Sequence, residues 1–338
     1  MKISKTIVAI VAALGLTAAG AATASSVLNE DGTVLASSGQ WQLHRTAEGI
    51  LMDNPFDRAI AAREVQDTYE FNGDTDPALA FVRATDDGLQ VGVEPMPHAE
   101  AHNGFFAVTH DAYPESSVFH VRMSKQPGQI QSAKEVGQAV FAVQTASTKI
   151  TGLINFIVLS ADSTEGMTSW RVGYMYGHVR NAEYINYYST EPSVDEPDTR
   201  DITLRTDGRR TLTVWFGEEQ VFHSDQLEMD IQAPYQPYLE VQAVKTPYFS
   251  SFQNFWVTED DDLELTGLPE TADVRLVDSQ GTVLGETSVR AGGTATLELP
   301  PYAAKGSGTL EISEPGRELV RLGSFDYAGG DELKVVTK

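Results

Sequence analysis

Along most of the chain, apolar and polar residues alternate in short runs that glycine, asparagine, aspartate and proline interrupt. Successive side chains of a strand point to opposite faces, so this period of two predicts strands, and helical periodicity of any length is scarce. The clearest runs are rich in β-branched and aromatic residues. They occupy residues 117–124, 139–145, 151–160, 169–179, 201–206, 211–217, 237–244 and 251–258. Long strands at near-regular spacing predict an all-β, two-sheet sandwich.

One helix is expected near the start of the chain. Asn54 is a residue type that caps helices, and Pro55 suits the first helical position. Good helix formers follow in the run FDRAIAAREV, residues 56–65.

The residue composition changes at TEDDDLEL, residues 258–265, where an acidic run follows an aromatic-rich strand. Beyond it, five or six short strands between residues 263 and 323 are separated by SQG, AGG and KGSG turns, and aromatic residues almost vanish. This change predicts a small second module of roughly 70 residues, within the usual range of domain sizes. The expected division is a signal segment over residues 1–24, a larger domain over 36–257, a small module over 259–325 and a C-terminal tail over 326–338.

The first residues have the features of a signal peptide. Lys2 and Lys5 form a short basic region, residues 6–22 are apolar or small, and residues 22–24 form an A-x-A cleavage site. This pattern predicts cleavage before Ser25 and a secreted or cell-surface protein, with an uncleaved anchor as the disfavoured alternative. No second apolar run of membrane length follows, so no membrane span is expected after cleavage.

The charge balance restricts the partners. The chain has 48 acidic and 24 basic residues, and loss of Lys2 and Lys5 with the signal leaves 48 against 22, a formal charge of −26. Nucleic acid and anionic membrane surfaces are therefore poor partners. With no cysteine there are no disulfides or thiolate metal sites. The acidity indicates either solubility or cation binding. Calcium stays open through residues 72–76 and 258–264, although neither has the Asp-x-Asp-x-Asp-Gly spacing.

Residues 115 to 257 resemble the concanavalin A-like lectin/glucanase superfamily. The stretches that carry the resemblance are FHVRMS, VGQAVFAVQT, RRTLTVWFGEEQVF, YQPYLEVQAV and FQNFWVTED. It implies a jelly roll of two curved antiparallel sheets, with glycan as the ligand class. The segment LTGLPETADVRLVDSQGTVLGETSVRAGGTATLELP is similar to small immunoglobulin-like β-sandwich modules that follow catalytic or binding domains.

The stretch LEMDIQ, residues 227–232, resembles the catalytic strand of laminarinase- and agarase-type hydrolases, which carries Glu-x-Asp-x-Glu or Glu-x-Asp-x-x-Glu. By that resemblance Glu228 is the nucleophile and Asp230 its modulator, but the acid/base position holds Gln232, or Ala233 in the longer spacing. Retaining hydrolysis needs two carboxyl groups about 5 Å apart, and glutamine cannot donate and recover a proton. We therefore expect no catalytic residue here, but a half-buried strand with a polar outer face.

An aromatic face is expected on the strand at residues 170–178, whose even positions carry a tryptophan, two tyrosines and a histidine around Val172. Aromatic rings pack against the C–H faces of sugars, so such a face suits a glycan groove. The same alternation is typical of a sandwich core, and the sequence leaves both interpretations open. The ligand-binding candidates are Trp170, Tyr174, Tyr176, His178, Glu228 and Asp230.

A histidine-rich stretch gives a weaker metal candidate. His98, Glu100 and His102 alternate, and His110 follows. Imidazole and carboxylate groups on one face bind zinc or copper. The stretch is rich in proline and alanine and lacks the HExxH spacing, so we expect a loop and no metal site.

With the superfamily resemblance, these features favour an exported, non-catalytic protein that binds a polysaccharide or surface glycan. The first alternative is a glycoside hydrolase or polysaccharide lyase with a non-standard site. The second is a self-assembling subunit of a cell-surface layer or filament, which the acidic, cysteine-free, sandwich-only chain would suit.

Overall fold

The computed structural model describes residues 32–54, 80–85, 88–93, 102–108, 112–126, 130, 135–146, 153–164, 166–178, 181–244, 246–289 and 293–337. Within them the regular structure is β-strand, apart from the 3₁₀-helix η3 (Pro301–Ala303). This confirms the all-β prediction. The signal segment and the helix expected after Asn54 lie outside the described residues. In this described part of the chain, no helix is long and apolar enough to cross a membrane.

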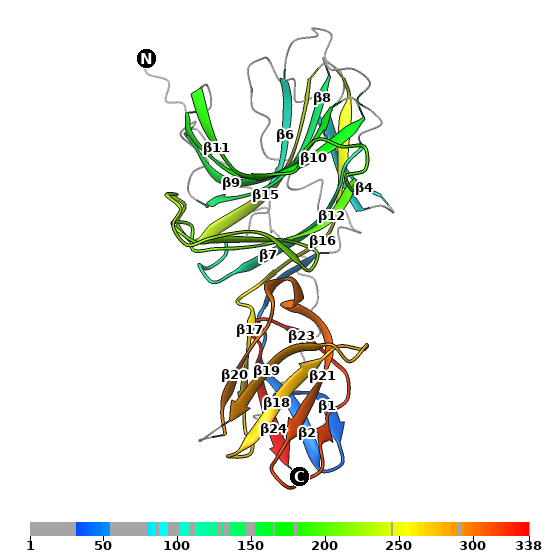
Figure 1. Cartoon of the computed structure of the whole chain (residues 1–338), viewed down its shortest axis with the longest axis vertical. Coiled ribbons are helices and arrows are strands. Elements are labelled where there is room, and N and C mark those ends of the chain that lie inside the picture. Colours follow the sequence, from blue (N-terminus) through cyan, green and yellow to red (C-terminus); the bar gives the residue numbers. More distant parts are fainter. Residues whose placement is uncertain are drawn as a thin grey trace, which may run out of the picture.

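Two antiparallel sheets face each other in the larger of two sandwiches (Figure 1). The first sheet has six strands in the order β11-β10-β9-β8-β15-β6. They are β6 (His102–Val108), β8 (Val136–Thr145), β9 (Leu153–Thr164), β10 (Met167–His178), β11 (Asn181–Ser189) and β15 (Tyr235–Val244). This sheet is strongly curved, and its concave side is turned away from the second sandwich (Figure 1).

The second sheet of the larger sandwich has eight strands. Its order is β14-β13-β12-β7-β16-β5-β4, and β3 also pairs with β16. They are β3 (Ile50–Asn54), β4 (Ala80–Thr85), β5 (Gly88–Val93), β7 (Val118–Ser124), β12 (Thr199–Thr206), β13 (Leu212–Phe216), β14 (Glu219–Ser224) and β16 (Tyr248–Thr258). The last strand, β16, returns to lie between β7 and β5. The two facing sheets confirm the predicted jelly-roll sandwich.

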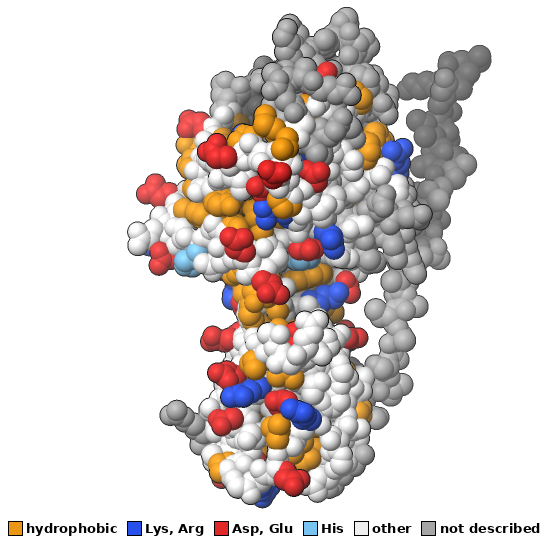
Figure 2. All heavy atoms as spheres, turned by 45° about the vertical axis from the view of Figure 1, so that its right-hand side comes forward, with side chains coloured by type: hydrophobic (Ala, Val, Ile, Leu, Met, Phe, Trp, Pro, Cys, Tyr) orange, Lys and Arg blue, Asp and Glu red, His pale blue; other side chains and the backbone are white. Residues whose placement is uncertain are grey.

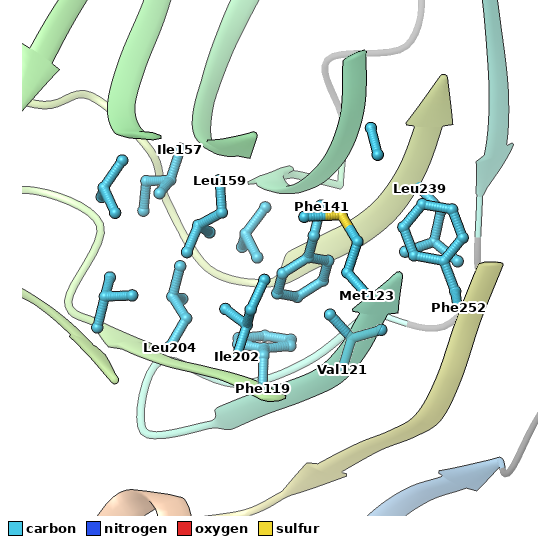
Figure 3. Close-up of a cluster of buried hydrophobic side chains, with 14 of the residues drawn as sticks. Phe119, Val121, Met123, Phe141, Ile157, Leu159, Ile202, Leu204, Leu239 and Phe252 are labelled. Atoms are coloured by element: carbon cyan, nitrogen blue, oxygen red, sulfur yellow. The ribbon is translucent and has the colours of Figure 1, made fainter. Parts of the chain in front are cut away.

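The core of the larger sandwich follows directly from the period of two. Phe119, Val121 and Met123 alternate along β7 and point toward Phe141 and Ile157 of the opposite sheet (Figure 3). All five side chains are fully buried. Burying a side chain of this size contributes about 1.5–3 kcal/mol, so these alternating positions supply much of the sandwich's stability.

A second, smaller sandwich is built from both ends of the chain, and we call it the terminal sandwich. One sheet has the order β1-β2-β24-β17-β20, with β17 and β24 parallel. The other has the order β19-β18-β21-β22, and β23 also pairs with β21. The strands are β1 (Thr33–Ser38), β2 (Trp41–Ala47), β17 (Asp262–Thr266), β18 (Ala272–Val277), β19 (Val283–Val289), β20 (Ala295–Glu298), β21 (Lys305–Ser313), β22 (Val320–Arg321), β23 (Phe325–Ala328) and β24 (Glu332–Thr337).

This architecture corrects two of the expected domain limits. The larger domain does not begin at residue 36, because β1 and β2 belong to the terminal sandwich, where β2 pairs with β24. Residues 326–338 are not a tail, because they contain β24, whose Leu333 and Val335 are buried beside Leu43 of β2. Pairing between opposite ends of a chain leaves no local signal in either strand. The immunoglobulin-like interpretation of this module stays a prediction.

Two chain crossings, from β2 to β3 and from β16 to β17, join the sandwiches. The first crossing also packs closely on the turn between β23 and β24, since a Cβ on Gly49 would lie 2.1 Å from the carbonyl oxygen of Gly329. The Glu259 N–H donates to the Gly49 carbonyl at 2.7 Å. The Asp331 carboxylate is 1% exposed and accepts hydrogen bonds from the Gly49 N–H at 2.8 Å and from Arg45 Nε at 3.0 Å. These contacts tie the two crossings to each other and to β24.

Candidate functional site

The aromatic face of β10 is directed into the core of the larger sandwich. Trp170 and Tyr174 are 1% and 5% exposed and belong to one buried cluster with Val172. The Trp170 Nε1–H donates to the Pro197 carbonyl at 2.9 Å, and its ring meets Phe216 of the opposite sheet at 5.7 Å between centroids. The two residues are core residues, which corrects their assignment as ligand contacts.

Tyr176 lies at the margin of this aromatic face and is half-buried. Its ring stacks on Tyr174 with 5.3 Å between centroids, and its hydroxyl donates to Glu183 Oε2 at 2.5 Å. That hydrogen bond raises the pKa of Tyr176, because the carboxylate stabilises the protonated phenol. His178 ends β10, but its side chain lies outside the described residues. A ligand contact at either residue stays a prediction.

The LEMDIQ stretch, residues 227–232, is extended but lies in none of the strands, so the strand prediction is wrong here. The N–H groups of Leu227, Met229 and Ile231 donate to the carbonyls of residues 208–210 at 2.9–3.0 Å. Met229 and Ile231 are buried, and the even-numbered residues are exposed. The predicted alternation of inward and outward side chains is therefore present without a sheet.

The two acids of this stretch, Glu228 and Asp230, are exposed. The Asp230 N–H donates to the Tyr174 hydroxyl at 3.1 Å, and the Gln232 N–H donates to Thr145 Oγ1 at 2.7 Å. These bonds tie the segment to the six-stranded sheet without placing either carboxylate on a strand. The strand geometry that the hydrolase resemblance implies is missing, and the absence of catalysis stays a prediction.

A different set of polar side chains lies on the concave side of the six-stranded sheet. The odd-numbered residues of β15 enter the core, so Tyr238, Glu240 and Gln242 point to the other side. Glu240 pairs with Val140 of β8, and Gln242 pairs with Gln138. Because β15 lies between β8 and β6, these side chains occupy the interior of the sheet and not its edge.

Glu240 has the most perturbed environment on this side. It is 2% exposed, and its Oε1 accepts a hydrogen bond from Gln242 Nε2. Burial raises the pKa of Glu240 to about 8, and the hydrogen bond from Gln242 lowers it by less. The carboxyl is therefore protonated at neutral pH. Its second oxygen then donates a hydrogen bond while the first accepts one.

Strands β10 and β11 extend the concave side. Arg171 and Met175 alternate with the core residues of β10 and are half-buried. Tyr184 of β11 is 38% exposed, and a Cβ on Gly173 would lie 2.4 Å from its ring. The missing side chain of Gly173 thus lets the Tyr184 ring pack directly on the backbone of β10. An exposed aromatic ring on a strand is a surface against which a sugar ring packs.

Glu240 is the residue that sequence reasoning missed. Its signal was available in PYLEVQAV, residues 237–244, where Tyr238, Glu240 and Gln242 alternate with three apolar residues. A carboxylate on an alternating strand normally marks a solvated face. Whether such a face is buried depends on residues distant in sequence, which alternation does not reveal.

Of the metal-site candidates, only the acidic run at residues 258–264 lies within the described residues. Asp260, Asp261 and Asp262 come close enough together to hold a cation. Arg205 donates to Asp260 Oδ1 at 2.8 Å and to Asp261 Oδ1, so a guanidinium already supplies positive charge there. The other candidates, residues 72–76, His98, Glu100, His110 and the side chain of His102, lie outside the described residues. Calcium binding stays a prediction.

No family model matches the chain, and no curated protein matches it either. Among solved structures, it is similar to a protein of unknown function with a galectin-like fold from Bacillus subtilis. The identity is 12%, the match covers 67% of this chain and 98% of that one, and the TM-score is 0.37. A glycoside hydrolase family 16 endo-glucanase from Bacteroides ovatus shares 11% identity over 60% of this chain and 100% of that one, with a TM-score of 0.39. Likeness at this level transfers no residue role.

Proposed function

We propose that this chain is an exported, non-catalytic protein that binds a polysaccharide or surface glycan on the concave side of its six-stranded sheet. The observation that carries the proposal is Glu240, a buried carboxyl on that side with Gln242 as its hydrogen-bond partner. A buried carboxyl with no counter-ion among the described side chains costs stability, so its presence is better explained by a ligand than by folding.

The chemistry of the concave side suits a sugar. Gln138, Gln144 and Gln242 are half-buried amides, and the buried, protonated Glu240 accepts a hydrogen bond from the Gln242 amide and so orients it. These neutral groups complement sugar hydroxyls, and the exposed ring of Tyr184 complements the apolar face of a sugar ring. A polyanionic glycan is disfavoured by the acidic chain.

A glycoside hydrolase is the second candidate, and one observation favours it. A glutamic acid whose pKa is raised toward neutrality is suited to act as a general acid. Hydrolysis also needs a second carboxyl, either as nucleophile or as base. Burial and the Gln242 hydrogen bond account for the pKa of Glu240, and no other carboxylate among the described side chains contributes. Binding is therefore the better supported activity.

Paired substitutions at Glu240 test the proposal. Glu240→Gln keeps a neutral donor and acceptor and is expected to retain glycan binding, while Glu240→Ala is expected to weaken it about tenfold, because Gln242 loses the partner that orients its amide toward the ligand. A glycan array identifies the ligand, and calorimetric titration measures the affinity. Glu311→Gln, in the terminal sandwich, is the matched control and leaves binding unchanged.

A reducing-sugar assay on the same polysaccharides separates the two candidates. Binding without sugar release supports the proposal. Sugar release that disappears in Glu240→Gln would instead establish a hydrolase with Glu240 as its acid. Neither binding nor release across the array would contradict both and favour the assembly subunit, which light scattering with and without calcium then tests.

A further inference from the structure

The side of the eight-stranded sheet that faces the terminal sandwich carries two tryptophans, Trp215 and Trp256, which are 8% and 6% exposed. The segment after η3 packs here, where Ala304 joins Val118 and Trp256 in an apolar cluster.

Beside this contact a cleft of about 890 Å³ separates the two sandwiches. Its lining includes Thr213 and Trp215 of β13, Gln220 and His223 of β14, and Pro301. Figure 2 shows the molecule narrowing between the sandwiches, with histidine, acidic and basic side chains on the surface there.

Neutral hydrogen-bonding groups line one wall of this cleft. Trp215 pairs with Gln220 and Thr213 pairs with His223, so the four side chains come from adjacent positions of two strands. His223 Nδ1 lies 2.9 Å from Thr213 Oγ1, which leaves its Nε2 for another partner. Gln220 and His223 are exposed, and no described residue bonds to the Gln220 amide or to the Trp215 indole N–H.

Two of the charged groups of the cleft, Arg205 and Asp207, already have partners. Arg205 donates to Asp260 and Asp261. The Asp207 carboxylate accepts three backbone N–H groups, from residues 209–211, at 2.7–2.9 Å. Glu115 at the lining adds a further acid, and the whole chain is acidic. An anionic ligand is therefore repelled, and a neutral ligand meets the indole, the amide and the imidazole.

We propose that this cleft is a second binding site, for a neutral saccharide unit that lies against Trp215 and bonds to Gln220 and His223. Its volume falls in the range of roughly 300–1,000 Å³ that small-molecule sites occupy. An indole surface with polar groups beside it matches a sugar ring, which has apolar C–H faces and a rim of hydroxyls. The site is on the opposite sheet from Glu240, so it stands independently of the function proposed above.

The test uses the indole N–H signals of the whole ¹⁵N-labelled protein. The Trp215 signal is the one that Trp215→Phe removes, and the probes are the methyl glycosides of glucose, galactose, mannose and N-acetylglucosamine. We expect a saturable shift of that signal with at least one probe, at millimolar affinity. Glucuronate, which is similar in size but anionic, is expected to give no saturable shift.

Two exposed variants assign the shift to the cleft. Gln220→Ala and His223→Ala each remove one hydrogen-bonding group and are expected to weaken binding about fivefold. The exposed control Gln226→Ala, outside the cleft, and Glu240→Ala, on the other sheet, leave it unchanged. The proposal is overturned if no neutral probe shifts the Trp215 signal, if both cleft variants bind as the unaltered chain does, or if glucuronate binds equally well.

Discussion

The outer faces of the two sandwiches differ in the surroundings of their ionisable side chains. On the terminal sandwich, oppositely charged side chains pair across neighbouring strands, as Arg275 does with Glu286 at 3.1 Å and Arg321 with Glu311 at 2.7 Å, and all of these but Glu311 are more than half exposed. On the concave side of the larger sandwich, Glu240 is buried with an amide partner. Exposed pairs contribute little to stability, whereas a buried carboxyl lowers it. The terminal sandwich thus has the surface of a structural module, while the larger one keeps a costly group that a ligand would explain.

Removal of residues 326–338 is expected to have the largest effect, the loss of the terminal sandwich. The deletion takes away Leu333 and Val335, which are 0% and 3% exposed, and it separates β2 from β17. Truncating a single buried leucine already costs about 2–5 kcal/mol. Differential scanning calorimetry should show that the heat absorbed by the terminal sandwich is gone. A thermal profile like that of the whole chain would mean that these residues are a dispensable tail.

The next largest effect is expected at Glu240 and depends on pH. The folded chain holds the Glu240 proton up to about pH 8, while the unfolded chain releases it near 4.5. The unfolded state therefore binds fewer protons in this window, and the free energy of unfolding falls as pH rises through it. At about 1.4 kcal/mol for each unit, the fall is about 3 kcal/mol between pH 5.5 and 8.

Glu240→Gln is expected to remove this contribution, and urea unfolding of both proteins at pH 5.5 and 8 measures it. Working above pH 5 avoids the sequence pI of about 4.5, where the chain loses its net charge. Glu311→Gln serves as control and keeps the pH dependence. A difference between Glu240→Gln and the unaltered chain that is the same at both pH values would show that Glu240 is ionised in the fold.

The sequence predicted the strands better than their partners. Alternation located β7, β8 and β10 within a few residues, because packing of one strand face leaves a local signature. It did not reveal that β2 and β24 pair, since that contact joins the two ends of the chain. The same limit explains the site. Alternation placed Trp170 on a defined face and did not single out Glu240, because which face of a strand is buried depends on the rest of the fold.

Asp331→Ala at the junction is expected to lower the free energy of unfolding by about 2–3 kcal/mol, because it leaves buried N–H groups without an acceptor. The carboxylate accepts from the Gly49 N–H at 2.8 Å and the Ala328 N–H at 3.0 Å, and it also binds Arg45. Thermal unfolding measures the change. The exposed Asp326→Ala, five residues away, is the control, and an equal effect of both substitutions would mean that Asp331 does not hold the crossings together.

The smallest effect is expected for the ion pair of Arg275 and Glu286, which joins β18 to β19 on the terminal sandwich. Their side chains are 53% and 65% exposed, so water screens the attraction. A double-mutant cycle of Arg275→Gln and Glu286→Gln is expected to give a coupling of about 0.3 kcal/mol, and 1 M salt should abolish it because the screening length there is about 3 Å. A coupling above about 1 kcal/mol that survives salt would contradict the contrast between the two faces. Arg275 and Glu286 would then be held in a fixed, partly desolvated geometry, and the outer face of the terminal sandwich would no longer be an example of weak pairing that water screens.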